Sequence, residues 1–378
     1  MSRSAGAPRV NRVALYVGAL LGPFGGGVVA AILPELSASF TVSTGVAASS
    51  LTSYLLPFAG VMLVSGTLGE RWGPARTIRI AYVVYAVAAI CSALAPWFWL
   101  FQVTRGVQGC ANAFTTPLLM AKLAAGTPTE RLGRALGLFG SMQAVGQTSA
   151  PLVGGLAAEL SWRWAFVGIA LVAAVLAACR LPPDSRASRD RPARLRDAWR
   201  RSILAPGLIG LVGWACLAGM SFLVAFRLED AFGLGSGLRG LVLTGFGVAG
   251  FLTARLVGAV ADRYGSRLAA ATGLLAGAVL LLAVGLVESL PVVAVSWALG
   301  GVCAQLVLVA VNTTVLSSTE RGRGGAISVV QAMRFLGMAA APAVFIVPYD
   351  ISAALGFAIP AALLVLVTPA VAWLRRPP

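Results

Sequence analysis

The chain has 378 residues, of which 58% are hydrophobic and 11% are charged, and its mean hydropathy is +0.87. A soluble domain carries about 25% charged residues, so this composition excludes a protein that faces water on all sides. The net charge of +16 would suit a nucleic-acid-binding protein, but the strongly basic stretch at residues 180–201 is too short for a folded basic domain and lies between apolar segments. We therefore expect an integral membrane protein that binds no nucleic acid.

Twelve apolar segments follow one another along the chain, and a helix that crosses a hydrocarbon core of ~30 Å takes about 20 residues. The segments lack the period-two alternation of a transmembrane barrel, and a helix satisfies every backbone polar group in lipid. The first segment has 22 uncharged residues, more than the apolar core of a signal peptide, so we expect it to be retained. The predicted fold is all-α, with twelve transmembrane helices near residues 13–33, 46–68, 77–95, 98–121, 135–157, 163–181, 203–225, 239–260, 267–287, 291–314, 325–347 and 352–374.

Lysine and arginine lie mainly at one end of these predicted helices. Of the 29 basic residues, 23 fall in the termini and loops of one side, three lie within predicted helices, and three fall on the other side, namely Arg163, Arg227 and Arg239. The positive-inside rule then places both termini in the cytoplasm. We expect a multi-pass protein of the cell membrane, in a bacterium the cytoplasmic membrane, whose basic residues also attract anionic lipid headgroups.

A short pattern between the second and third predicted helices recurs in the second half of the chain. GTLGERWGPAR at residues 66–76 is matched by GAVADRYGSR at residues 258–267, at an offset close to half the length of the chain. Halves that repeat in this way are typical of alternating-access transporters. The basic linker between the halves is interpreted equally well as an amphipathic helix near residues 193–201 on the inner leaflet or as a solvated tether. The predicted domains are an N-terminal six-helix bundle at residues 1–181, a cytoplasmic linker at 182–202 and a C-terminal six-helix bundle at 203–378.

Three motifs follow one another in the first half. Residues 66–73 read GTLGERWG, residues 105–109 read RGVQG, and residues 146–155 read GQTSAPLVGG. In this order and spacing they resemble the signatures of the major facilitator superfamily, with Glu70 where aspartate is usual and Ala150 where a second glycine is expected. The third motif resembles that of exporters in the twelve-helix drug/proton antiporter branch. Its residues here are Gly146, Pro151, Gly154 and Gly155.

The resemblance implies a role for the repeated turn. Glu70 and Arg71 are implied to latch the two halves together on the cytoplasmic side when the protein opens outward. Glycine permits a tight turn and a close backbone approach, and an acid at a helix end can accept hydrogen bonds from the facing half. The simpler interpretation is a capped turn whose charges only follow membrane topology. The residues of the two copies are Gly66, Glu70, Arg71, Gly73, Gly258, Asp262 and Arg263.

Polar side chains inside the predicted helices are costly in lipid and are therefore candidates for function. Arg105, Gln108 and Asn112 share one helix face, and Arg334 follows Gln331 by three residues on another helix. We expect such residues to line a central substrate cavity, in which the two arginines have no acid at mid-depth to pair with. For the amides, the alternative is that they join helices by hydrogen bonds. The predicted cavity residues are Arg105, Gln108, Asn112, Gln143, Gln147, Gln305, Asn312, Gln331 and Arg334.

Exchange against protons requires a protonatable group. The sequence contains no histidine, and none of its 13 Asp and Glu residues falls in the middle of a predicted helix. Glu35 and Asp230 follow the first and seventh predicted helices, positions that rim the cavity in the fold that the resemblance implies. They are the candidate proton sites, and the alternative is that both are surface acids.

The predicted function is that of a secondary active transporter of the multidrug-resistance type. It would work by alternating access and export a hydrophobic or amphipathic, drug-like small molecule in exchange for protons. The alternative is a facilitator or proton symporter for an organic anion bound by Arg105 and Arg334. The sequence lacks histidine, an aspartate pair within the predicted helices and a G-x-x-x-x-G-K-[S/T] loop, so an intramembrane enzyme and a nucleotide-driven pump are disfavoured. We expect a monomer without cofactor or metal, whose partners are the substrate, protons and lipids.

Overall fold

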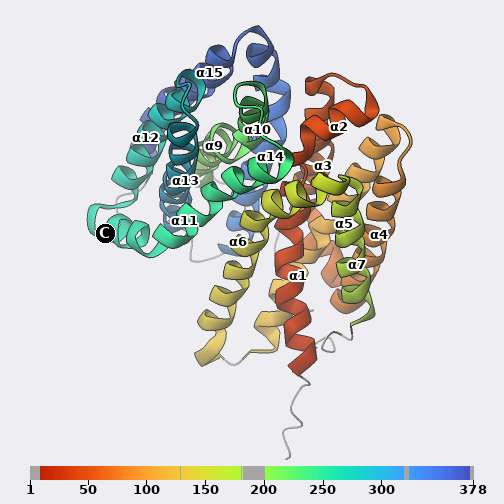
Figure 1. Ribbon diagram of the computed structural model, residues 1–378. Coiled ribbons are helices and arrows are strands. Elements are labelled where there is room, and N and C mark those ends of the chain that lie inside the picture. Colours follow the sequence, from red (N-terminus) through yellow and green to blue (C-terminus); the bar gives the residue numbers. More distant parts are fainter. Residues whose placement is uncertain (1–8, 128, 180, 182–200, 319–322, 375–378) are drawn as a thin grey trace, which may run out of the picture.

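The computed structural model describes residues 9–127, 129–179, 181, 201–318 and 323–374, and all regular elements in these ranges are helices (Figure 1). The first half of the chain contributes α1 (Arg9–Gly27), η1 (Ala30–Ile32), α2 (Leu33–Phe40), α3 (Thr44–Trp72), α4 (Pro74–Leu94), α5 (Phe98–Ala125), α6 (Thr129–Leu160) and α7 (Arg163–Ala178). The second half contributes α9 (Arg201–Cys216), η3 (Ala218–Met220), α10 (Ser221–Asp230), α11 (Ser236–Tyr264), α12 (Ser266–Leu286), α13 (Leu290–Ser318), α14 (Arg323–Ile351), α15 (Ala353–Val367) and η4 (Thr368–Trp373). The predicted all-α fold is confirmed for this part of the chain, whereas most of the predicted linker lies outside it.

The helix boundaries repeat between the two halves of the chain. α3 and α11 each have 29 residues, and α4 and α12 each have 21 residues. Both pairs of helices begin at the offset that separates the two copies of the sequence pattern. The turns between them match as well, because Gly73 has a φ of 90° and Gly265 a φ of 86°. Glycine adopts a positive φ without the strain that a side chain would add, so these glycines end one helix and allow the next to begin. The repeat predicted from the sequence is thus a repeat of helices.

The first predicted span of each half is interrupted. α1 is followed by η1 and α2, and α9 is followed by η3 and α10, so the two short 3-10 helices occupy corresponding places in the two halves. In α1 the interruption follows Pro23 and three glycines, which remove a backbone donor and weaken the helix. Interruptions at corresponding positions of two repeats are typical of the helices that flank a transporter's binding site.

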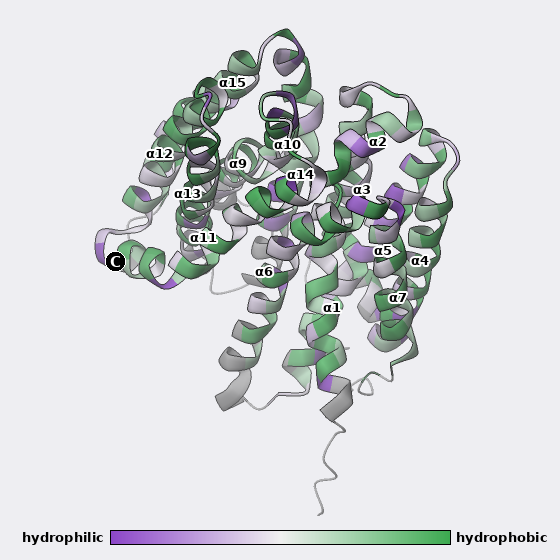
Figure 2. Ribbon diagram, in the orientation of Figure 1, coloured by the Kyte–Doolittle hydropathy of each residue, from purple (hydrophilic) through white to green (hydrophobic). Residues whose placement is uncertain are grey.

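Nine helical segments of the described chain are long and apolar enough to cross a membrane. These segments are Arg12–Phe40, Thr44–Gly66, Pro74–Leu94, Leu204–Asp230, Ser236–Ala261, Ser266–Leu286, Leu290–Val315, Val329–Ile351 and Ala353–Trp373. The other three predicted spans fall on α5 and α6, which have 28 and 32 residues, and on the apolar, 16-residue α7. That these three helices also cross the membrane stays a prediction, as does the cytoplasmic location of the termini. Figure 2 shows hydrophobic residues along most of the helices.

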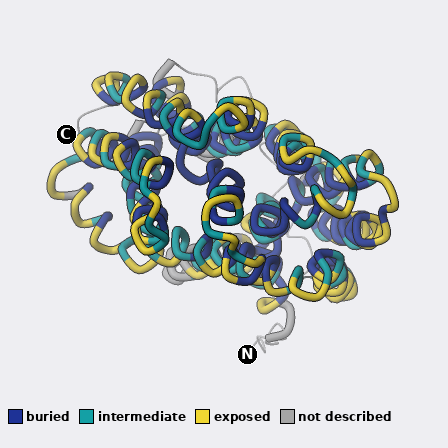
Figure 3. The backbone as a smooth tube through the Cα atoms, turned by 45° about the horizontal axis from the view of Figure 1, so that its top comes forward, coloured by how far each residue is buried: buried dark blue, intermediate teal, exposed yellow. Residues whose placement is uncertain are grey.

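We call the described residues among 9–178 the N-terminal bundle and those among 201–374 the C-terminal bundle. Within the first, α3 packs against α5, α4 against α7, and α1 against α6; within the second, α12 and α11 pack against α13, and α14 against α9. The two bundles contact each other through α6 with α11 and α3 with α14. Buried residues lie on the inner faces of the helices and exposed ones on the periphery (Figure 3). Many of the exposed residues are large and apolar, as a lipid-facing surface requires.

Candidate functional site

Two glycines of the third motif bring α6 against α1. A Cβ atom at Gly146 would lie 2.1 Å from the carbonyl oxygen of Leu20, and one at Gly154 would lie 2.4 Å from that of Val28. These distances are too short for any side chain. The two glycines therefore allow backbone contact between α6 and α1 within the N-terminal bundle.

The rest of the motif faces α11 in the other bundle. A Cβ atom at Gly155 would lie 2.2 Å from the carbonyl oxygen of Ser236, and one at Gly240 would lie 2.3 Å from that of Pro151. The backbones of α6 and α11 are thus in direct contact across the boundary between the bundles. Such contacts depend on shape rather than on long side chains.

The second contact between the bundles joins α3 and α14. The hydroxyl group of Thr52 donates a hydrogen bond of 2.6 Å to the carbonyl oxygen of Ala339. The rings of Phe58 and Phe335 meet edge to face, with their centroids 4.8 Å apart. These contacts lie in the half of α3 and of α14 that is nearer to Glu35. We call this end of the molecule the Glu35 end. The opposite end, which contains the turn at Gly73, is called the Arg71 end.

The contacts between α6 and α11 stop towards the Arg71 end. A Cβ atom at Gly247 would lie 2.2 Å from the side chain of Thr148 on α6. Gly258 lies about three helical turns further along α11 and on the same face. A Cβ atom at Gly258 would nevertheless meet no atom within 4 Å. The bundles are therefore closed against each other at the Glu35 end and separate towards the Arg71 end (Figure 1).

A charged cluster joins the bundles at the Glu35 end. Arg239, at the start of α11, has only 2% of its side chain exposed and forms ion pairs with Glu35 of α2 and Glu229 of α10. The distance from Arg239 to the Glu229 carboxylate is 3.1 Å, and a further hydrogen bond of 3.0 Å goes to the carbonyl oxygen of Leu234. Glu35, predicted to be a proton site or a surface acid, is thus paired across the boundary between the bundles.

Two more acids at this end have specific partners. The carboxylate of Glu159, at the end of α6, accepts a hydrogen bond of 2.8 Å from the backbone N–H of Gly237, in the first turn of α11. An anion is favoured at a helix N-terminus, so this contact also holds the two bundles together. Asp230, the second candidate proton site, accepts a hydrogen bond of 2.9 Å from the hydroxyl group of Tyr349 on α14. No sequence pattern pointed to a role for Glu159 or Arg239, although Arg239 is one of the few basic residues on its side.

Arg105 lies wholly inside the N-terminal bundle, with none of its side chain exposed. Its guanidinium group donates hydrogen bonds of 3.0 Å to the carbonyl oxygen of Gly25 and 2.9 Å to the side chain of Gln108. The ring of Tyr54 lies 4.3 Å from the guanidinium carbon, and that of Phe166 lies 5.7 Å from it. The charge is therefore stabilised by a carbonyl group at the break in α1 and by two aromatic faces.

The other two polar residues of this α5 face also bond within the N-terminal bundle. The amide of Gln108 donates to Ser92 of α4 at 2.7 Å, and that of Asn112 donates to the carbonyl oxygen of Gly22 at 2.9 Å and to the hydroxyl group of Tyr54 at 2.6 Å. Both side chains are buried. The prediction of a shared face is confirmed, and the geometry agrees with the alternative in which the amides join helices. That these residues also meet the substrate stays a prediction.

Arg334 has a different environment in the C-terminal bundle. Its guanidinium carbon lies 3.7 Å from the ring centroid of Trp214 on α9, and it donates a hydrogen bond to the side-chain oxygen of Gln331, one turn earlier on α14. Only 7% of Arg334 is exposed. Within the described residues it forms no ion pair, so its charge has no carboxylate partner.

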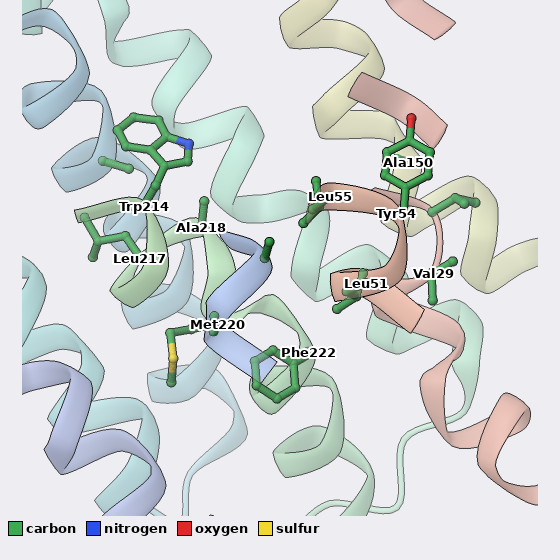
Figure 4. Packing of buried hydrophobic residues seen from close by; sticks show 14 of the residues in the cluster. Val29, Leu51, Tyr54, Leu55, Ala150, Trp214, Leu217, Ala218, Met220 and Phe222 are labelled. Carbon is green, nitrogen blue, oxygen red and sulfur yellow. The ribbon is translucent and has the colours of Figure 1, made fainter. Parts of the chain in front are cut away.

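Trp214 and the residues near it lie opposite α3 of the N-terminal bundle. Figure 4 shows this arrangement, with one side formed by α9 and η3 and the other by α3. Trp214, Leu217, Ala218, Met220 and Phe222 lie on the first side, and Leu51, Tyr54 and Leu55 lie on the second.

Four predicted cavity residues have polar side chains that the protein does not fully bury. Gln147 is exposed, and Gln143, Gln305 and Asn312 are partly exposed. In the part of the chain that is described, none of the four side chains has a hydrogen-bond partner. Such positions are free to meet water or a ligand, and their role in a cavity stays a prediction.

The predicted latch lies at the end where the bundles are apart. Arg71 and Arg263 are exposed, and Arg263 lies beside the ring of Tyr264 at 5.4 Å. The side chains of Glu70 and Asp262 lie outside the described part of the structure. Since a latch that closes in the outward-open state would be open here, its function stays a prediction.

Comparisons with known proteins identify the family. The family model "Major Facilitator Superfamily" matches residues 15–241 and 215–378. A multidrug resistance protein B homolog of Mycobacterium tuberculosis is 32% identical over 177 residues, which are 45% of this chain and 32% of the relative. An uncharacterized MFS-type transporter of Bacillus subtilis, YybF, is 30% identical over 249 residues, 62% of this chain and 61% of the relative. The chain thus spans less than two thirds of the length of these curated relatives.

Two solved structures show the same fold. A bacterial homolog to the human lysosomal transporter Spinster, in an inward-facing and unoccupied conformation, has a TM-score of 0.77 and 16% identity over 97% of both chains. The nucleoside transporter NupG has a TM-score of 0.81 and 12% identity over 96% of this chain and 100% of the other. Together with the family model, which covers more than half of the chain, these findings show that the chain belongs to the major facilitator superfamily.

Proposed function

We propose that this chain, which belongs to a family of membrane transporters and not of enzymes, exports hydrophobic or amphipathic small molecules from the cell by alternating access, in exchange for protons. The observation that carries this proposal is the contact of the two bundles along one half of their length only, with α6 placed between α1 and α11 by the motif that resembles exporters. The similarity to a curated relative named as a multidrug resistance protein B homolog supports a drug-like substrate.

The contacts at the Glu35 end suit a boundary that opens and closes. They consist of glycine contacts between α6 and α11, one hydrogen bond from Thr52 and an ion-pair cluster around Arg239. These contacts lie along the same two helix pairs and at the start of α11, at one end of the molecule, so that a rigid rotation of one bundle can break them together. The positive-inside rule places the open Arg71 end in the cytoplasm, which corresponds to a state ready to take up an export substrate.

Proton exchange is assigned to the acids of the Glu35 end. A proton on Glu35 neutralises a carboxylate that holds Arg239, and this weakens the ion pair that joins the bundles. Protons that arrive from outside would then favour the opening of this end. Asp230 bonds to Tyr349 within the C-terminal bundle, so its protonation would leave the boundary between the bundles intact.

Transport in proteoliposomes tests the proposal. With the purified protein, we expect an imposed pH gradient to accelerate the movement of a lipophilic fluorescent dye such as Hoechst 33342. Glu35→Gln should remove the dependence on the gradient, and the matched variant Asp230→Asn should keep it. Dye movement that ignores the gradient in the unmodified protein would reject proton exchange, and the absence of dye movement would reject drug export.

A facilitator for an organic anion is the second candidate. Arg334 favours it, because its charge lacks a carboxylate partner in the described structure. It lies over Trp214 and precedes Phe335, whose ring meets that of Phe58 in the other bundle. This observation leads to a more specific inference about the substrate.

A further inference from the structure

Three side chains of the C-terminal bundle form a cluster of hydrogen-bond donors. Arg334 and Gln331 lie one turn apart on α14, and the guanidinium group of Arg334 lies over the indole ring of Trp214 on α9 at 3.7 Å. The acceptor oxygen of Gln331 is already used by Arg334. What remains at this cluster is a set of N–H groups.

These N–H groups lack partners but are not sealed off. In the described structure, Nη2 of Arg334, Nε2 of Gln331 and Nε1 of Trp214 donate no hydrogen bond, and none of them belongs to the buried atoms without a partner. Each of the three nitrogen atoms therefore keeps some accessible surface. Nε of Arg334, by contrast, is buried and has no partner. The accessible donors are free to bind a ligand.

The chain itself offers this cluster no negative charge. Along α14 the next carboxylate is that of Asp350, about 24 Å along the helix from Arg334. Arg239 differs, because it has two carboxylates. Arg105 resembles Arg334 in having only neutral acceptors, but its Nε and Nη2 atoms are buried without a partner, so no ligand reaches them. A buried charge that lacks a counterion is costly, so a ligand with a negative group would be stabilised strongly at Arg334.

We propose that Trp214, Gln331 and Arg334 bind the carboxylate or sulfonate group of an organic anion, and that such anions are substrates of this transporter. A guanidinium group binds a planar carboxylate through paired hydrogen bonds, and the neighbouring amide and indole N–H groups add donors. The apolar body of the anion would contact Phe335, the next residue on α14. The ring centroid of Phe335 lies 4.8 Å from that of Phe58, across the boundary between the bundles. The inference rests on the proposed transport function and names the chemical class of the substrate.

An anionic substrate would also add a second driving force to the proton exchange proposed for the Glu35 end. None of the 13 Asp and Glu residues lies at mid-depth of a predicted helix, so the centre of the molecule has no group that could exchange a proton for a cation. A monovalent anion needs no such group to leave the cell. An inside-negative potential of 100 mV favours its exit by about fiftyfold.

Binding to the purified full-length protein tests the inference. The probes are 2-naphthoate, its uncharged amide 2-naphthamide and the cation 2-naphthylmethylamine, measured by equilibrium dialysis with detergent-solubilised protein. We expect 2-naphthoate to bind most tightly and Arg334→Gln to weaken its binding by about tenfold or more, with little effect on the amide. Arg163→Gln is the matched control, because Arg163 also lies over a tryptophan ring, that of Trp162 at 4.4 Å, but at the Glu35 end of the N-terminal bundle.

Two further variants protect the test against a fold defect. Arg334→Lys keeps the charge and should bind 2-naphthoate with intermediate affinity, and Trp214→Phe keeps an aromatic ring but removes the indole donor, which should weaken binding by a smaller factor than Arg334→Gln. Three results would each overturn the inference. The first is equal affinity for the anion and the cation, and the second is an equal loss of 2-naphthoate affinity in Arg163→Gln. The third is no binding of 2-naphthoate by the unmodified protein at millimolar concentration. Dye transport in proteoliposomes is measured separately, so proton-coupled export can fail while anion binding holds, and the reverse.

Discussion

A guanidinium group in a membrane protein is stable when its charge and its donors find partners, and three buried arginines of this chain meet that condition differently. Arg239 is held by carboxylates, Arg105 by a carbonyl oxygen and aromatic rings, and Arg334 by one amide and one aromatic ring. The first two therefore contribute to the fold or to the contact between bundles. Arg105 and Arg334 both lack a carboxylate in the described structure, but Nε and Nη2 of Arg105 are sealed inside the bundle, whereas Nη2 of Arg334 keeps accessible surface. Of these two arginines, Arg334 is therefore the one that a ligand can reach.

This difference predicts opposite effects on stability. Arg105→Ala leaves the oxygens of Gly25 and Gln108 without their donor and opens a cavity beside Tyr54, so we expect a loss of about 3 kcal/mol in the free energy of unfolding. Arg334→Gln removes a buried charge without a carboxylate partner and should leave the stability unchanged or raise it. Denaturation by SDS in mixed micelles measures both variants. Equal losses would show that Arg334 is as structural as Arg105.

At the scale of helices, much of the fold could be predicted from the sequence. Apolar length located the helices, and the matching turns at Gly73 and Gly265 predicted a repeat that the helix boundaries reproduce. These features are local, because a helix and a glycine turn depend on neighbouring residues. The interruption of α1 also had a local signal in Pro23 and the glycines that follow it.

The direction of a polar helix face could not be predicted in this way. Helical spacing correctly placed Arg105, Gln108 and Asn112 on one face of α5, but their partners are backbone oxygens of α1 and side chains of α3 and α4. Those partners become neighbours only when the bundle has formed. The same reason explains why Glu159 was missed, since its partner is the N-terminus of a helix in the other half of the chain.

The contact between α6 and α11 predicts that one methyl group affects the closed end. A methyl group at Gly155 would lie 2.2 Å from the backbone of Ser236, so Gly155→Ala should force the helices apart and weaken closure of the Glu35 end. Cysteines introduced by Gly45→Cys and Ile346→Cys report this closure, because a Cβ atom at Gly45 would lie 3.3 Å from the Ile346 side chain across the boundary. We expect a clear fall in disulfide yield in a chain whose five natural cysteines are alanine.

Gly168→Ala is the matched control for this experiment. Gly168 lies on α7, away from the other bundle, and a Cβ atom there would meet nothing within 4 Å. The disulfide yield should be unchanged in this variant. If Gly155→Ala also leaves the yield unchanged, then the glycine contact does not limit the approach of the two bundles.

At the scale of the whole molecule, the two bundles meet at one end and separate at the other. In a transporter built from two rigid bundles, closing one end opens the other, because the helices that form both ends are the same. α3, α6, α11 and α14 each extend from the Glu35 end towards the Arg71 end. A change confined to one end should therefore be felt at the other.

Arg239→Gln tests this reciprocity. The substitution leaves the carboxylates of Glu35 and Glu229 without their shared cation, and their repulsion favours a state in which water reaches both. Ile346 is a buried contact at the Glu35 end, so the rate at which a thiol reagent labels Ile346→Cys reports opening of that end. We expect this rate to rise about tenfold, because loss of a buried ion pair shifts the equilibrium between the closed and open states by at least that factor. The labelling of Gly258→Cys at the Arg71 end should fall, because the same movement closes that end. Arg163→Gln removes a charge from the Glu35 end without touching the cluster and should change neither labelling rate. If the labelling rate rises at position 346 but does not fall at position 258, the opening is local and the bundles do not move as whole units.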